Sequence, residues 1–198
     1  MKRLPNILTL FRLILTIIFI FCLTRQGLAP AVTAVFVFLL ASLTDYYDGY
    51  LAKKYDAVTN FGKIMDPIAD KFLILAAFYI FTGMGIISAW MFGIILVREV
   101  LVTGTRMMFI GKGLYLAAER AGKYKTVSQI VAVYVILVFI LLQRHPVLSA
   151  GLERNLDLWL TAIGMLMAVT VLMTVISGMS YLWNNRWAFA AQNRNGES

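Results

Sequence analysis

The chain has 198 residues, 61% of them hydrophobic, and a mean hydropathy of +0.80. Soluble domains are about 45–50% apolar, so this composition excludes an ordinary soluble domain and indicates an integral membrane protein. The net charge of +8 fits basic loops resting on anionic lipid. We expect membrane lipids and no nucleic acid as partners, because no soluble basic domain is evident.

The apolar runs predict an all-α membrane protein. A span needs about 20 residues, and the run over 72–97 is too long for one span and is interrupted by "TGMGIIS". We therefore expect six transmembrane helices, over 5–24, 28–53, 60–82, 87–110, 120–143 and 156–183. Together they form one transmembrane domain over 1–185, followed by a polar C-terminal tail over 186–198.

The positions of the basic residues predict the orientation of these spans. Of the 18 lysines and arginines, all but Arg25, Arg144 and Arg154 fall on the side of the N-terminus if six spans are crossed. Lysine and arginine are in excess on the cytoplasmic side of membrane proteins. We therefore expect a multi-pass protein of the inner (cytoplasmic) membrane with both termini in the cytoplasm.

The first span carries a polar stripe on an otherwise apolar helix. Asn6, Thr9 and Arg12 recur at intervals of three residues, so they share one side of that helix. The stripe either faces lipid headgroups at the end of the helix or contributes to a polar site.

Four aspartates flank the connection between the second and third spans. Asp45 and Asp48 are three residues apart, and Asp66 and Asp70 are four apart, so each pair shares one face of its helix. Both pairs lie at about the same depth, so all four can meet in one polar cavity that opens to the cytoplasm.

Each acidic face is continued by residues with almost no side chain. Gly49 and Ala52 stand four residues after Asp45 and Asp48, and Gly62 stands four before Asp66. Small residues let two backbones, or a backbone and a ligand, approach closely.

Four clustered carboxylates need protonation or a counter-ion, because they repel one another. Each would also cost about 2.5–3.5 kcal/mol in a span. Divalent cations with oxygen ligands remove that cost, and Mg²⁺ or Mn²⁺ suits carboxylates better than zinc does. Two such ions could clamp phosphate oxygens during a displacement. The alternative is structural, with the aspartates paired to basic residues such as Lys53, Lys63, Lys71 or Arg98.

Basic residues of the fourth and fifth spans are candidates for binding an anion. Arg98, Arg106, Lys123 and Lys125 could cradle the phosphate of a phosphorylated substrate. Alternatively, Arg98 pairs with one of the aspartates or with Glu119. We expect its neighbour Glu99 to point elsewhere on the helix.

The acidic segments resemble a known family. The pattern Asp45-x-x-Asp48-Gly49-x-x-Ala52-Lys53, eight residues, then Gly62-x-x-x-Asp66-x-x-x-Asp70 is similar to the signature of the CDP-alcohol phosphotransferases, with Lys53 where the family usually has arginine.

The resemblance implies a membrane enzyme that joins a CDP-linked lipid to an alcohol and releases CMP. It implies that Asp45, Asp48, Asp66 and Asp70 bind two divalent metal ions and that Asp70 is also the general base. It further implies that the CDP-linked lipid contacts Asn6, Thr9, Asp48, Gly49, Ala52, Lys53, Thr59 and Gly62.

Five stretches, "PNILTLFR", "TDYYDGYLAKK", "FGKIMDPIADK", "VREVLVTGTR" and "GKYKT", resemble the branch of this family that makes phosphatidylglycerophosphate. That resemblance implies CDP-diacylglycerol as donor, sn-glycerol 3-phosphate as acceptor and a homodimer. The alternatives are a family member with another acceptor (inositol phosphate, serine or phosphatidylglycerol) and, from another class, a cation transporter that uses intramembrane aspartates.

Overall fold

The computed structural model describes the backbone of residues 4–55, 60–111 and 120–187, and these residues are almost entirely helical. Side chains are described over 9–44, 71–109 and 122–187 and at residues 69 and 111. The helices are α1 (Leu4–Thr24), α2 (Leu28–Tyr55), α3 (Asn60–Gly83), α4 (Ala89–Gly111), α5 (Arg120–Arg144), α6 (Ser149–Arg154) and α7 (Leu156–Asn184).

The six long helices match the six that the sequence predicts, with ends that differ by at most two residues. Two of the tight connections contain a glycine in the left-handed region, Gly27 with φ 106° and Gly85 with φ 73°, which residues with a side chain rarely adopt. The short helix α6 is not among the predictions. It has six residues, too few to give an apolar run of its own.

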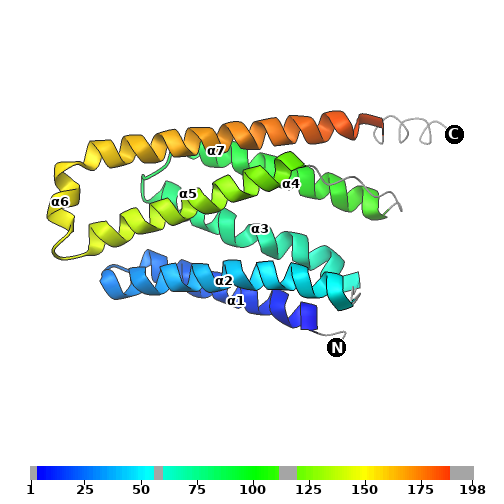
Figure 1. Ribbon diagram of the computed structural model, residues 1–198, viewed down its shortest axis with the longest axis horizontal. Helices are drawn as coiled ribbons and strands as arrows, with labels where there is room; N and C mark the ends of the chain where they lie inside the picture. The colour runs from blue at the N-terminus through cyan, green and yellow to red at the C-terminus, as the bar shows by residue number, and fades with distance from the viewer. Residues whose placement is uncertain (1–3, 56–59, 112–119, 188–198) are drawn as a thin grey trace.

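The long helices run along the length of the molecule, and the chain reverses at each connection (Figure 1). α1 begins and α7 ends at the same end of the bundle, while α6 joins α5 to α7 at the other end. α1 packs on α2 and α3, α5 packs on α2, α3 and α7, and α4 packs on α3 and α7. Polar residues of the first five helices can therefore converge.

A core of aromatic and aliphatic side chains holds these helices together. Phe19, Phe38 and Phe78 are fully buried, and the Phe38 ring meets Tyr134 edge-on, with 5.1 Å between the ring centroids. Such edge-to-face pairs add about 0.5–1.5 kcal/mol to the gain from burial. This pair joins α2 to α5, and the tilted Phe19 and Phe38 rings, with centroids 5.6 Å apart, join α1 to α2.

The outside of the bundle is apolar, as in a membrane protein. Exposed large hydrophobic residues include Ile17 on α1, Phe36 on α2 and Met179 on α7. Among the described residues, two helical stretches are long and apolar enough to cross a membrane, Gly122–Arg144 and Leu156–Asn184. α1, α2 and α3 contain shorter apolar stretches, Thr9–Thr24, Leu28–Thr44 and Lys71–Gly83.

Candidate active site

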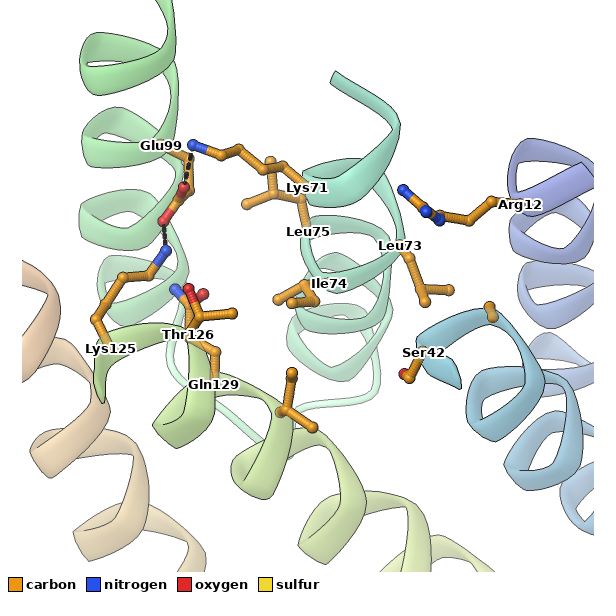
Figure 2. Close-up of a pocket in the computed structure, with 12 residues that line it drawn as sticks. Arg12, Ser42, Lys71, Leu73, Ile74, Leu75, Glu99, Lys125, Thr126 and Gln129 are labelled. Carbon is orange, nitrogen blue, oxygen red and sulfur yellow. Dashed lines mark hydrogen bonds and ion pairs between the residues drawn. The ribbon is translucent and has the colours of Figure 1, made fainter. Parts of the chain in front are cut away.

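A polar cavity of about 210 Å³ lies where the first five helices meet. Its wall combines charged, amide and hydroxyl groups with aliphatic side chains (Figure 2). The lining residues are Arg12, Ala41, Ser42, Lys71, Leu73, Ile74, Leu75, Glu99, Lys125, Thr126, Gln129 and Ile130.

The centre of the charged wall is the carboxylate of Glu99 on α4. This side chain is buried, and Figure 2 shows Lys71 of α3 and Lys125 of α5 reaching it from opposite sides. Lys71 Nζ lies 2.8 Å from Oε2, and Lys125 Nζ donates to Oε1. Lys71 also donates to the hydroxyl of Thr103 at 2.5 Å. One carboxylate therefore ties three helices together.

Arg98 joins the same network from the other side of α4. Its Nη1 donates to Glu99 Oε1 at 3.3 Å, and its Nη2 donates to the Ser177 hydroxyl of α7 at 2.7 Å. The expectation that Glu99 points away from Arg98 is wrong. The Arg98 side chain reaches both Glu99 and Ser177, and Gly178, which has no Cβ, leaves room for it.

Among the side chains that the structure describes, the charges in this network do not cancel. Three cations, Lys71, Arg98 and Lys125, contact one glutamate. Excess positive charge in a site with little water attracts anions more strongly than the same charge in solution does. The wall is thus suited to a phosphorylated ligand.

Two further polar side chains line the cavity. Arg12 of α1 and Gln129 of α5 are each 2% exposed, and Figure 2 shows Arg12 across the cavity from Gln129. Thr9 is buried as well. The polar stripe of α1 therefore faces the bundle interior at Thr9 and Arg12, and the headgroup-facing alternative is wrong for these two residues.

The four aspartates lie next to this cavity in the sequence. Asp45 and Asp48 belong to α2 and Asp66 and Asp70 to α3, but their side chains lie outside the described residues. Ser42, one turn before Asp45, and Lys71, immediately after Asp70, both line the cavity. At 1.5 Å per residue, the cavity begins within a turn of Asp45 and of Asp70.

A family model described as CDP-alcohol phosphatidyltransferase matches residues 2–176. The chain belongs to this family.

Curated relatives match along nearly the whole chain. The CDP-diacylglycerol–glycerol-3-phosphate 3-phosphatidyltransferase of Bacillus subtilis (strain 168) is 36% identical over 98% of this chain and 100% of its own length. A probable phosphatidylglycerophosphate synthase of Mycobacterium tuberculosis (strain CDC 1551 / Oshkosh) is 36% identical over 91% of this chain and 80% of its own. The CDP-diacylglycerol–glycerol-3-phosphate 3-phosphatidyltransferase of Rickettsia typhi (strain ATCC VR-144 / Wilmington) is 32% identical over 91% of this chain and 96% of its own length.

Because it belongs to this family, the chain is a phosphotransferase enzyme. Its intramembrane aspartates are then explained without the alternative function of a cation transporter. The family signature lies within the matched residues, in α2 and α3 and the connection between them. Of the residues expected to contact the CDP-linked lipid, Asn6, Gly49, Ala52, Lys53 and Gly62 are in helices but have no described side chain, and Thr59 lies outside the described residues.

The four expected phosphate ligands of this transferase are only partly brought together. Lys125 lines the cavity and Arg98 contacts its wall at Glu99. Arg106 does not line it, although its buried Nε has no hydrogen-bond partner among the residues that the structure describes. Lys123 is exposed and lies outside the cavity, because it is two residues from Lys125 and so on another side of α5.

Five polar residues of the wall were not among the expected site residues: Ser42, Lys71, Glu99, Thr126 and Gln129. A signal existed for Glu99, since a carboxylate inside an apolar span is costly unless it has a partner. Lys71, in the middle of α3, had been considered only as a structural partner of the aspartates. Gln129 carried no such signal, because a lone glutamine is ordinary on a membrane helix.

The described residues contain no group of three or more histidine, cysteine, aspartate or glutamate side chains that could hold a metal ion. The signature aspartates are outside that set. Their donor chemistry fits hard divalent cations, because α2 and α3 bring only carboxylate oxygens at 45, 48, 66 and 70.

Proposed function

We propose that this enzyme transfers the phosphatidyl group of CDP-diacylglycerol to sn-glycerol 3-phosphate. The products are phosphatidylglycerophosphate and CMP. The observation that carries the proposal is the near-complete match to relatives named for this reaction, at 36% identity over 98% of the chain. The cation-rich wall of the cavity supports it, because the acceptor named by those relatives carries a phosphate.

Asp45, Asp48, Asp66 and Asp70 would hold two divalent ions, Mg²⁺ or Mn²⁺, which supply charge neutralisation of the diphosphate and of the leaving CMP. Asp70 accepts the proton of the acceptor's C1 hydroxyl. The hydroxyl oxygen forms a bond to the β-phosphorus as the bond from that phosphorus to the CMP oxygen breaks. Asp48, Gly49, Ala52, Lys53, Thr59 and Gly62, with Asn6 and Thr9 of α1, bind the CDP-linked lipid.

The acceptor phosphate binds against the cluster of Arg98, Arg106 and Lys125, with Lys123 attracting it at the mouth of the cavity. The support is that Lys125 lines the cavity and that Arg98 contacts the same carboxylate as Lys125 does. Arginine also suits phosphate, because its planar group donates two parallel hydrogen bonds.

The enzyme crosses the inner (cytoplasmic) membrane six times, with the site and both termini in the cytoplasm, and forms a homodimer. The start of α1 and the end of α7 lie at the same end of the bundle (Figure 1), which supports an even number of crossings. The excess of basic residues on that side supports the orientation.

The acceptor assignment is tested by supplying the purified protein with CDP-diacylglycerol, Mg²⁺ and one alcohol at a time. CMP release is expected with sn-glycerol 3-phosphate and not with serine, inositol 1-phosphate or phosphatidylglycerol. Release with one of the other three acceptors, and none with glycerol 3-phosphate, would refute the assignment while leaving the family unchanged.

A further inference from the structure

The amide of Gln129 is a buried donor without a partner. The residue is 2% exposed, and its Nε2 atom has no hydrogen-bond partner in the described structure. Buried side-chain donors are nearly always satisfied, because leaving one unpaired costs the hydrogen bonds it made to water. An unpaired amide in the wall of a cavity therefore points to a ligand.

The position of Gln129 relates it to the phosphate-binding wall. It follows Lys125 by four residues, so the two share a face of α5 and lie about 6 Å apart along the helix. A three-carbon phosphorylated alcohol that binds near Lys125 can therefore also reach Gln129. Lys71, next to the proposed base Asp70, lines the same cavity from α3.

The cavity is small. Its volume of about 210 Å³ lies below the roughly 300–1,000 Å³ of sites for drug-sized ligands. Hydroxyl groups of Ser42 and Thr126 and the amide of Gln129 line it beside the charged network. This lining suits a short ligand with a hydroxyl group, because a hydroxyl both donates and accepts hydrogen bonds.

We propose that Gln129 hydrogen-bonds the C2 hydroxyl of glycerol 3-phosphate and thereby determines acceptor specificity. This inference rests on the proposed function. The C1 hydroxyl reacts and the phosphate binds the cationic wall, so C2 is the one carbon whose hydroxyl needs a partner of its own. A site built to bond a hydroxyl rejects the analogue that lacks it, since its own polar group is then left unpaired.

The test compares two acceptors, sn-glycerol 3-phosphate and 3-hydroxypropyl phosphate, which lacks only the C2 hydroxyl. The wild-type enzyme should prefer glycerol 3-phosphate. Gln129→Leu should lower kcat/KM for glycerol 3-phosphate by about tenfold, mainly through KM, and change that for 3-hydroxypropyl phosphate by less than about twofold. Gln143→Leu, at an exposed position of the same helix, should change neither.

Equal losses with both acceptors, in Gln129→Leu and also in Gln129→Met, would overturn the assignment and make Gln129 a structural residue. A wild-type enzyme that uses both acceptors equally well would overturn it too. Those results leave the proposed function standing, whereas a wild-type enzyme that ignores glycerol 3-phosphate and uses another acceptor refutes both.

Discussion

At the scale of single residues, Glu99 decides how the charged wall is organised. It is 3% exposed and accepts from Lys71, Arg98 and Lys125. A buried charge is tolerated when partners compensate it, and among the described side chains here the excess is positive. The carboxylate holds both lysines in place in the wall of the cavity.

Glu99→Gln is expected to destabilise the protein by about 3 kcal/mol, because it leaves the buried Lys125 without its counter-charge. Thermal unfolding in detergent measures the loss. The double variant Glu99→Gln/Lys125→Met should recover part of it, since the unpaired charge is removed with its partner. If Glu99→Gln were as stable as the wild type, the ion pairs of Glu99 would contribute nothing to the stability of the protein.

Asp70→Asn is expected to abolish turnover while leaving binding of the CDP-linked lipid largely intact. The amide keeps an oxygen for a metal ion but cannot accept the proton of the acceptor hydroxyl. CMP release and titration calorimetry with CDP-diacylglycerol separate the two effects. Wild-type turnover in this variant would remove Asp70 from the role of base.

At the scale of helices, α4 and α7 are held together by the hydrogen bond from Arg98 to Ser177, beside Gly178. Arg98 passes over Gly178 to reach Ser177, and a Cβ at Gly178 would lie 3.1 Å from Arg98 Cγ. At the other end of the bundle, Arg144 of α5 donates to the carbonyls of Leu23 and Arg25 at 3.0 and 2.9 Å. It satisfies free groups at the C-terminus of α1.

Gly178→Val is expected to destabilise the protein by about 1–3 kcal/mol, because the side chain displaces Arg98 from Ser177. Gly164→Val is the matched control on α7, where a Cβ would meet nothing within 4 Å. The two variants are compared by thermal unfolding in detergent. An equal loss in both would mean that the packing at Arg98 is adaptable.

At the scale of the whole molecule, the prediction concerns orientation in the membrane. A protein with Cys22 replaced by serine provides a background for single cysteines at Lys123 and Val147, both exposed and near opposite ends of α5. A membrane-impermeant maleimide should label position 147 in spheroplasts and position 123 only after permeabilisation, because the basic side faces the cytoplasm. The reverse pattern would invert the topology.

The number and ends of the long helices could be predicted because both depend on local features. Apolar runs of sufficient length form helices in lipid, and Gly27 and Gly85 stand where the chain turns. The shared face of each aspartate pair follows equally from intervals of three and four residues. The partners of Arg98 could not be predicted, since Ser177 lies 79 residues away on another helix.

The sequence by itself determined the helical class, the family signature and the acidic faces of the second and third helices, because each is written in spacing along one segment. Only the tertiary structure decided that Lys71, Glu99 and Lys125 meet, that Lys123 stays outside and that Gln129 lines the same cavity. Helix rotation and packing set these contacts, and both result from the sum of many distant side-chain contacts that no single segment contains.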